Sequence, residues 1–222
     1  FFCKMKKLKY IFLLAGALSL ASCESWLDED PQYTINTKTQ FSTVENARQA
    51  LMGCYGYMSA DNAYGQAWQE VTFGYCGFGW SQTNGSSTDL LVSMDGGIDE
   101  TINTMAWRGM YKVIGETNAF IANIADSPLE SADKLPMEAA ARFLRALAYY
   151  NLAVTYGDVP LKTTPSAHDG VAVPRSPKNE VFELVRTDWE FAYENLPEKD
   201  DDGFATKWAA KAYLGKLYHT LG

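Results

Sequence analysis

The sequence predicts an all-α fold made of antiparallel helix pairs, with few or no short strands. Apolar residues recur every three or four positions along most of 41–222, which is the spacing of one helix face. Proline, glycine and capping residues stand where these periodic segments begin and end. Strand-like patterns are confined to 89–93 and 171–173, which predict at most a short ribbon.

The first helix is expected within 41–58, FSTVENARQALMGCYGYM. Ser42 followed by Glu45 is a capping-box pattern, in which each side chain bonds a free N–H of the first turn. The apolar positions that follow at helical spacing are Val44, Ala47, Leu51, Tyr55 and Met58. We expect this face to pack against the rest of the protein.

One stripe of side chains runs along the second expected helix, 105–124. Its members step by four and three, and they are Trp107, Tyr111, Ile114, Asn118 and Ile121. Asn118 interrupts the apolar stripe, and a buried amide needs hydrogen-bond partners. We expect these partners on neighbouring backbone or a neighbouring helix, which is a structural role.

The strongest helix pattern covers 136–161. Pro136 stands where a helix accepts proline, in its first turn, and Gly157 and Pro160 are stop signals. The stripe between them consists of Phe143, Leu147, Tyr150 and Val154. This pattern predicts a long helix with one buried side.

Two more helices are expected to form a hairpin joined by the acidic loop EKDDDG. The first covers 176–197, with Ser176 as its cap and Pro177 in its first turn. Its apolar side is formed by Val181, Leu184, Val185, Trp189, Ala192 and Leu196. The second begins at the cap Thr206 and continues to the end of the sequence.

This hairpin resembles tetratricopeptide architecture. Small residues of the last helix, Ala209, Ala212 and Gly215, offer a face for close packing. The triplet Arg-Ala-Leu at 145–147 recurs loosely as Lys-Ala-Tyr at 211–213, near twice the period of about 34 residues that such repeats have. The resulting fold class is a partial array of tetratricopeptide-like helix pairs.

The first 22 residues have the layout of an export signal. Lysines surround Met5, and the apolar run 10–20 is shorter than the roughly 20 residues that cross a bilayer. We therefore expect 1–22 to be a signal peptide that starts at Met5, with 1–4 upstream of the true start. Cys3 then lies outside the mature protein.

Cys23 follows Leu20, Ala21 and Ser22 directly, and this stretch resembles a bacterial lipobox. The resemblance implies cleavage before Cys23 and lipidation of that residue, because several acyl chains give lasting membrane attachment. The alternative is an ordinary secretory signal with a chance cysteine. With lipidation, 23–40 is an acidic linker and 41–222 is the helical domain.

Charge and composition restrict the class of protein. Four of the 19 basic residues and none of the 27 acidic ones precede Cys23, which leaves 15 basic against 27 acidic residues and a net charge of −12. Such a surface does not favour nucleic acid or anionic lipid. With 47% hydrophobic and 14% aromatic residues, the chain is globular and not disordered.

Cysteine and histidine give no sign of a metal site. Cys54 lies in a helical apolar pattern and Cys76 in a glycine-rich aromatic stretch, so we expect two buried free thiols, with a disulfide between them as the alternative. His168 and His219 are isolated, and no spacing of Cys and His suggests zinc. The sequence therefore predicts no metal and no cofactor.

Several ordered motifs resemble the SusD/RagB family of outer-membrane nutrient-binding lipoproteins. Cys23 followed by WLDEDP is similar to the opening of its mature chains, and FSTVENARQALMGCY is similar to its first helix. WRGMYKVIGETNAFIANI, AAARFLRALAYYNLAVTYGDVPL, VPRSPKNEVFELVRTDWEFAYENLP and TKWAAKAYLGKLY follow in the family's order. The likeness extends along nearly the whole chain after Cys23.

The resemblance implies a function as well as a fold. It implies a non-catalytic lipoprotein, anchored in the outer membrane and facing the cell exterior, that captures oligosaccharides or sometimes peptides. Its partner would be a SusC-like TonB-dependent transporter, over which it would form a lid. Family chains are longer, so we expect 41–222 to be the N-terminal part of the domain, incomplete at its C-terminal side.

The candidate ligand-binding residues lie in the stretch 63–85, where aromatic residues alternate with glycines. Sugars stack their CH faces on flat rings, and their hydroxyls pair with amides and carboxylates. Family members use a loop in this region for ligand contact, which favours Trp80 and Asn84, followed by Tyr75 and Phe78. The alternative is that these rings only cover the helix pair.

Other functions are less well supported by the residues. A glycosidase needs two carboxylates at a defined separation, and no spacing here singles out a pair. Asp200, Asp201 and Asp202 lack the alternating ligands of a calcium loop, which predicts a solvated turn. Arg142 and Arg145 are expected in structural ion pairs. A lipid-anchored scaffold that binds proteins or peptides remains the alternative function.

Overall fold

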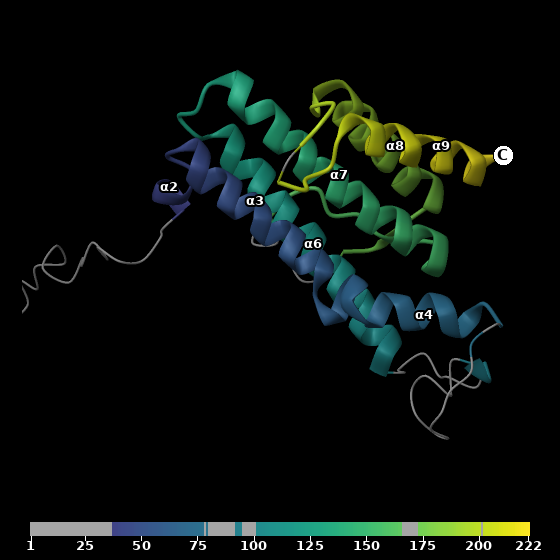
Figure 1. Ribbon diagram of the computed structural model, residues 1–222. Helices are drawn as coiled ribbons and strands as arrows, with labels where there is room; N and C mark the ends of the chain where they lie inside the picture. Colours follow the sequence, from purple (N-terminus) through teal and green to yellow (C-terminus); the bar gives the residue numbers. More distant parts are fainter. Residues whose placement is uncertain (1–36, 78, 80–91, 95–100, 166–172, 201) are drawn as a thin grey trace, which may run out of the picture. The chain divides into compact units, whose positions relative to one another are not determined.

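Helices account for most of the described residues, as the sequence predicts (Figure 1). This computed structural model describes residues 37–77, 79, 92–94, 101–165, 173–200 and 202–222. The elements in chain order are α2 (Thr37–Gln40), α3 (Val44–Ser59), the π-helical turn η2 (Asp61–Gly65), α4 (Ala67–Tyr75), α6 (Thr101–Ala125), α7 (Ser131–Tyr156), β1 (Val159–Pro160), β2 (Arg175–Ser176), α8 (Lys178–Asn195) and α9 (Lys207–Leu221).

The helices pack in a sequence of neighbours, which confirms the all-α fold of paired helices. The two longest, α6 and α7, have 25 and 26 residues and pack against each other. On the other side α8 packs against α7, and α9 packs against α8 (Figure 1). The short helices α3 and α4 both contact α6.

The core lies between α7 and its neighbours. Trp189 of α8 is fully buried, and its indole N–H donates to the carbonyl of Phe143 at 3.3 Å. The Trp189 ring lies 5.5 Å from that of Tyr150 and 5.2 Å from that of Tyr213, which links α7, α8 and α9. Such aromatic pairs add to the stabilisation that burial alone gives.

The helix starts show three corrections to the sequence-based prediction. The first is at α3, where Thr43 and not Ser42 is the cap. Thr43 has extended backbone and accepts from the Asn46 N–H at 3.2 Å, whereas the Ser42 hydroxyl donates to the carbonyl of Thr39 at 2.8 Å. The helix therefore begins one residue later than expected, and Val44 is exposed while Ala47, Leu51 and Met58 are buried.

The second correction concerns α7, which begins at Ser131 and contains Pro136 inside it. The N–H groups of Asp133 and Lys134 both bond the carbonyl of Glu130, so a complete turn precedes the proline. Proline there removes one backbone hydrogen bond, and the buried face beyond it outweighs that loss. The predicted end is confirmed, because Gly157 takes φ 75°, a conformation that suits glycine.

The third correction concerns α8. Ser176 lies in the ribbon, where β2 pairs antiparallel with β1 through Val159 opposite Ser176 and Pro160 opposite Arg175. The carboxylate of Asp158 accepts from the first helical N–H, that of Lys178, at 2.8 Å. The ribbon thus brings Asp158, which is 20 residues before Lys178, to the start of α8, where its carboxylate caps the helix. It also differs from the predicted ribbon positions, of which 89–91, 171 and 172 lie outside the described residues.

The last helix begins after Thr206, as predicted, but packs through a different face. Ala210 and Leu217 are buried against α8, whereas Ala212 and Gly215 are exposed. A Cβ on Gly215 would meet no atom within 4 Å. Of the predicted small-residue face, Ala209 is partly buried against the core, whereas Ala212 and Gly215 are not used for close packing in the described part of the chain.

The two cysteines of the helical region have different environments. Cys54 is buried, and burial raises the pKa of its thiol to about 12, with Glu116 adding to the shift. Cys76, at the end of α4, is exposed, so the expectation that both thiols are buried is wrong for this residue. Both are free, as expected.

Candidate functional site

The sequence-predicted binding residues are only in part within the described chain. Phe78, Trp80 and Asn84 lie outside the described residues, as does the lipidation candidate Cys23. Tyr75 is described, and it is the last residue of α4, with 41% of its side chain exposed. The described part of the candidate site is therefore the end of α4 and the residues around it.

A close contact between the turn η2 and helix α6 sets the position of α4. Between α3 and α4 the chain turns through η2, in which Ala63 has the non-helical angles φ −121° and ψ −121°. This turn lies against α6 at Gly109, where a Cβ would be 1.9 Å from the carbonyl oxygen of Asn62. Glycine in a helix interior costs about 1 kcal/mol relative to alanine. The close approach of the Asn62 carbonyl explains why α6 has a glycine at position 109.

Three half-buried aromatic residues, an asparagine and the exposed Tyr75 line the region beside the end of α4. We call this group the ledge, and it consists of Tyr75, Asn103, Trp107, Tyr111 and Tyr156. The Trp107 ring lies 5.0 Å from that of Tyr111 and 5.1 Å from that of Tyr156. Asn103 Nδ2 donates to the Tyr75 hydroxyl at 2.9 Å, and the Tyr156 hydroxyl donates to the Asn103 carbonyl at 3.4 Å.

The ledge combines flat rings with polar atoms. Burial raises the pKa of Tyr156 to about 12, with Tyr75 adding to the shift, and burial also raises the pKa of Tyr111. Their hydroxyls therefore stay neutral well above pH 7. The Tyr111 hydroxyl donates to the carbonyl of Pro160 at 2.7 Å, which fixes that ring. Rings with a few polar groups are the usual composition of a small-molecule site.

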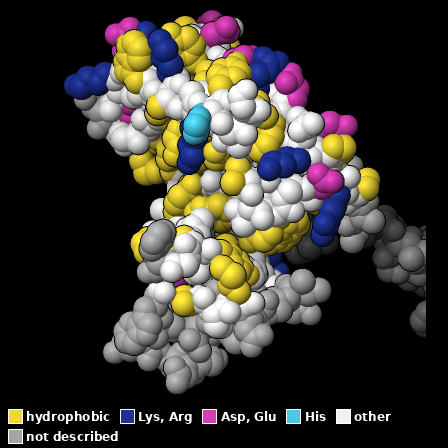
Figure 2. Space-filling model, turned by 90° about the vertical axis from the view of Figure 1, so that its right-hand side faces the viewer, with side chains coloured by type: hydrophobic (Ala, Val, Ile, Leu, Met, Phe, Trp, Pro, Cys, Tyr) yellow, Lys and Arg dark blue, Asp and Glu magenta, His cyan; other side chains and the backbone are white. Residues whose placement is uncertain are grey.

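Figure 2 shows one face of the molecule from its side, with the charged side chains gathered mainly in the upper half. In the lower half, hydrophobic side chains predominate among those coloured by type. Phe73 of α4 is 67% exposed and Met94 is 66% exposed, so large apolar side chains are accessible near the end of α4.

The sequence did not reveal the whole ledge. The helical spacing predicts a packing stripe that includes Trp107 and Tyr111, and both are half-buried. Asn103 precedes Trp107 by one helical step of four, a spacing that could have drawn attention to it. Tyr156 comes from the end of α7, and no local pattern connects it with α6.

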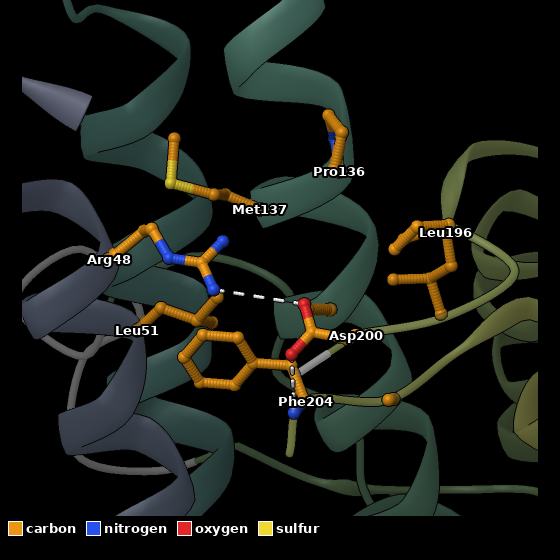
Figure 3. Close-up of a pocket in the computed structure, with 10 residues that line it drawn as sticks. Arg48, Leu51, Pro136, Met137, Leu196, Asp200 and Phe204 are labelled. Carbon is orange, nitrogen blue, oxygen red and sulfur yellow. Dashed lines mark hydrogen bonds and ion pairs between the residues drawn. The ribbon is translucent and has the colours of Figure 1, made fainter. Parts of the chain in front are cut away.

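A small hollow, shown in Figure 3, lies between α3, α7 and the loop before α9. Its volume is about 50 Å³, far below the roughly 300 Å³ or more of a ligand pocket. The guanidinium of Arg48 pairs with Asp200 at 3.7 Å and also with Asp202, and it lies 4.8 Å from the centre of the Phe204 ring. We interpret this hollow as part of a structural clamp.

The clamp corrects the prediction of a solvated turn at Asp200 alone, because the Asp202 side chain is 60% exposed, as predicted, and Asp201 lies outside the described residues. The Asp200 side chain is only 12% exposed, because its carboxylate accepts from the N–H groups of Asp202 and Phe204 at 2.9 and 3.2 Å. The Tyr55 hydroxyl accepts from the Ala205 N–H at 2.8 Å. Arg48 and Tyr55 belong to α3, so this loop is attached to a helix that is distant in sequence.

A buried polar network crosses α6, α7 and α8. Arg145 forms two hydrogen bonds of 2.8 Å with the Asp188 carboxylate and donates to Asn118 Oδ1 at 2.9 Å. Asn118 Nδ2 donates to the carbonyls of Lys162 and Thr164 at 3.0 and 3.2 Å. The structural roles expected for Asn118 and Arg145 are confirmed. Arg142 also pairs with Glu138, at 2.6 Å.

Neither a membrane-spanning helix nor a cluster of metal ligands occurs among the described residues. No helix among them is at once long enough and sufficiently apolar to cross a bilayer. Nor do three or more of their His, Cys, Asp or Glu side chains come together in a way that could hold a metal ion. The ledge, with its packed rings and hydrogen-bonded polar atoms, is the candidate site in the part of the chain that the structure describes.

Known proteins resemble this chain in sequence and in fold. The chain is 26% identical over 223 residues to the SusD-like protein P25 of Formosa agariphila, a match that covers 94% of this chain and 42% of that protein. A solved crystal structure that contains a xylogluco-oligosaccharide is similar to this chain, with 26% sequence identity and a TM-score of 0.65. The match covers 76% of this chain and 34% of the other chain. A laminarin-binding SusD-like protein shares the fold, with 24% identity, a TM-score of 0.68 and coverage of 80% and 40%.

The chain thus spans less than half the length of the curated relative that it matches. A sequence profile with the description "Starch-binding associating with outer membrane" matches residues 25–219. This match includes all the described helices, from α2 to the last turns of α9. On this match, the chain belongs to the SusD-like family.

Proposed function

We propose that this protein is a non-catalytic cell-surface lipoprotein that binds oligosaccharides and delivers them to a SusC-like TonB-dependent outer-membrane transporter. The observation that carries the proposal is the ledge of half-buried rings beside the end of α4, in a chain of the SusD-like family. The related structure with a xylogluco-oligosaccharide supports a carbohydrate as the ligand. The domain is proposed to be 41–222, as the N-terminal part of a longer protein.

The chemistry of the ledge fits a neutral sugar. Trp107 and Tyr156 present rings near a hydrogen-bonded pair, Asn103 and Tyr75. A sugar offers CH faces to such rings and hydroxyl groups to such polar atoms. Phe78, Trp80 and Asn84 follow α4 directly in sequence. We therefore propose that they complete the ligand site together with Tyr75.

Glycan binding is tested by replacing the proposed stacking residue. We expect Trp80→Ala to weaken binding of xyloglucan or laminarin oligosaccharides by the full protein at least about tenfold, because a buried aromatic contact is worth about 1.5 kcal/mol or more. Isothermal titration calorimetry measures this change. Trp208→Ala is the matched control, since Trp208 lies on α9 and is half exposed.

The same samples distinguish the alternative functions. Equal affinity of the Trp80 and Trp208 variants would contradict the proposed site. If neither glycan binds and the protein instead retains peptides, the scaffold function is correct. New reducing ends that accumulate over time would show cleavage, and the non-catalytic assignment would then be wrong.

We propose lipidation at Cys23 as the means of attachment to the outer membrane. Small residues precede this cysteine after a short apolar run, and two or more acyl chains suffice for stable anchoring. In cells fed an alkyne-labelled fatty acid, we expect the label and membrane retention in the wild type and neither in Cys23→Ala. Cys76→Ala should keep both, and retention of Cys23→Ala in the membrane would overturn the proposal.

A further inference from the structure

The Tyr75 hydroxyl lies at the end of α4, close in sequence to the residues predicted to bind the ligand. Tyr75 is the last residue of α4, and the sequence continues directly into the predicted binding residues Phe78, Trp80 and Asn84. Its side chain is 41% exposed, yet its hydroxyl is held by Asn103 Nδ2 at 2.9 Å. The ring therefore combines an accessible face with a fixed polar end.

The direction of this hydrogen bond determines what Tyr75 can still do. A phenol oxygen has one proton to donate and can also accept. Here it accepts from the amide of Asn103, so its own O–H remains a donor. Among the described residues no acceptor receives this proton. Asn103 Oδ1 does not receive it either, because that oxygen is buried and has no hydrogen-bond partner.

Asn103 is itself held by contacts from two helices. It lies in the first turn of α6, and its carbonyl accepts from the hydroxyl of Tyr156, at the end of α7, at 3.4 Å. The Tyr156 ring packs at 5.1 Å against Trp107, with the two ring planes 83° apart. The ends of α4 and α7 and the start of α6 thus meet at one residue, which Tyr156 contacts through the backbone and Tyr75 through the side chain. The backbone of Asn103 is held by Tyr156, and its amide is directed at Tyr75 by the bond from Nδ2.

We propose that Asn103 is a positioning residue that keeps the Tyr75 hydroxyl as a donor toward an acceptor oxygen of the bound oligosaccharide. The proposal rests on the proposed function, because it assigns a specificity role within that site. Hydroxyl, ring and glycosidic oxygens of a sugar can all accept such a bond. A donor whose direction is fixed in advance costs little ordering when the ligand binds.

The test uses the effect of reversing the hydrogen bond. In Asn103→Asp the carboxylate accepts the Tyr75 proton, so Tyr75 loses its free donor. We expect Asn103→Asp and Tyr75→Phe each to weaken oligosaccharide binding by the full protein about tenfold, which is one hydrogen bond lost. The double variant should bind no more weakly than Tyr75→Phe alone, because both changes remove the same donor. Additive losses would overturn the proposal.

A second readout does not depend on glycan binding. The ¹³C chemical shift of the Tyr75 phenol carbon, in protein labelled at that carbon, responds to whether the hydroxyl donates or accepts. We expect a shift change in Asn103→Asp and none in Thr104→Ala, a neighbouring change on α6 outside the ledge. If the wild type binds no oligosaccharide, the proposed function fails, and the chemical shift then tests only whether Asn103 sets the direction of the Tyr75 hydrogen bond. An unchanged Tyr75 signal in Asn103→Asp refutes that role.

Discussion

Replacing Gly109 with alanine is expected to destabilise the protein by about 3 kcal/mol, the upper part of the range for forced overpacking. An added Cβ would lie 1.9 Å from the Asn62 oxygen, 2.4 Å from the Asn62 carbonyl carbon and 3.0 Å from the Ala63 nitrogen. All three are backbone atoms, so no side-chain rotation relieves the clash. The better helix propensity of alanine returns only about 1 kcal/mol. Urea unfolding followed by circular dichroism measures the net change.

Two other glycines supply a control of opposite sign. Gly53 and Gly56 lie inside α3, and a Cβ at either position meets no atom within 4 Å. We expect Gly53→Ala and Gly56→Ala each to stabilise the protein by about 0.5–1 kcal/mol through helix propensity alone. If Gly109→Ala behaves like these two, the crossing of η2 over α6 is not the contact that places α4.

Helix ends show where local sequence was sufficient and where it was not. Gly157 and Thr206 were predicted correctly, because a left-handed glycine and a capping hydroxyl act on their own few residues. At Ser42 and Thr43 two equivalent hydroxyls compete, and the pattern could not choose between them. The cap of α8 comes from Asp158, which reaches it only because the ribbon folds back.

The same distinction applies to the sites. The structural roles of Asn118 and Arg145 could be predicted, since polar side chains in an apolar stripe must pair with something when buried. The pairing of the acidic loop with Arg48 could not be predicted, because Arg48 lies 154 residues before Asp202 in the sequence. Tyr75, Asn103 and Tyr156 come from three helices, so their meeting depends on tertiary packing.

Removing the buried charge partner of Arg145 is the second change with a large expected effect. Asp188→Ala is expected to cost about 3–5 kcal/mol, because it leaves a guanidinium buried without a counter-charge. The Asp188 side chain is fully buried and that of Arg145 is 6% exposed, so water cannot replace the lost carboxylate without opening the core. The loss should appear as a lower urea midpoint at an unchanged slope.

The double variant Arg145→Met with Asp188→Leu separates the cost of an unpaired charge from the value of the pair. It removes both charges, so we expect it to recover most of the stability that Asp188→Ala loses. Recovery should be incomplete, since Asn118 Oδ1 loses the donor Arg145 Nη1 and Arg142 loses its contact with Asp188. An unsatisfied buried acceptor costs about 1–3 kcal/mol.

An exposed ion pair on α8 gives the scale for comparison. Arg186 pairs with Glu183 and Glu190 on the surface, and Arg186→Met should shift the urea midpoint far less than Asp188→Ala. If the two variants have similar midpoints, Arg145 reaches water when Asp188 is removed. The network would then hold the loop at Lys162 and Thr164 mainly through Asn118, whose Nδ2 bonds to both carbonyls need no charge. Asn118→Leu would in that case destabilise the protein more than Asp188→Ala does, which is the reverse of the order expected here.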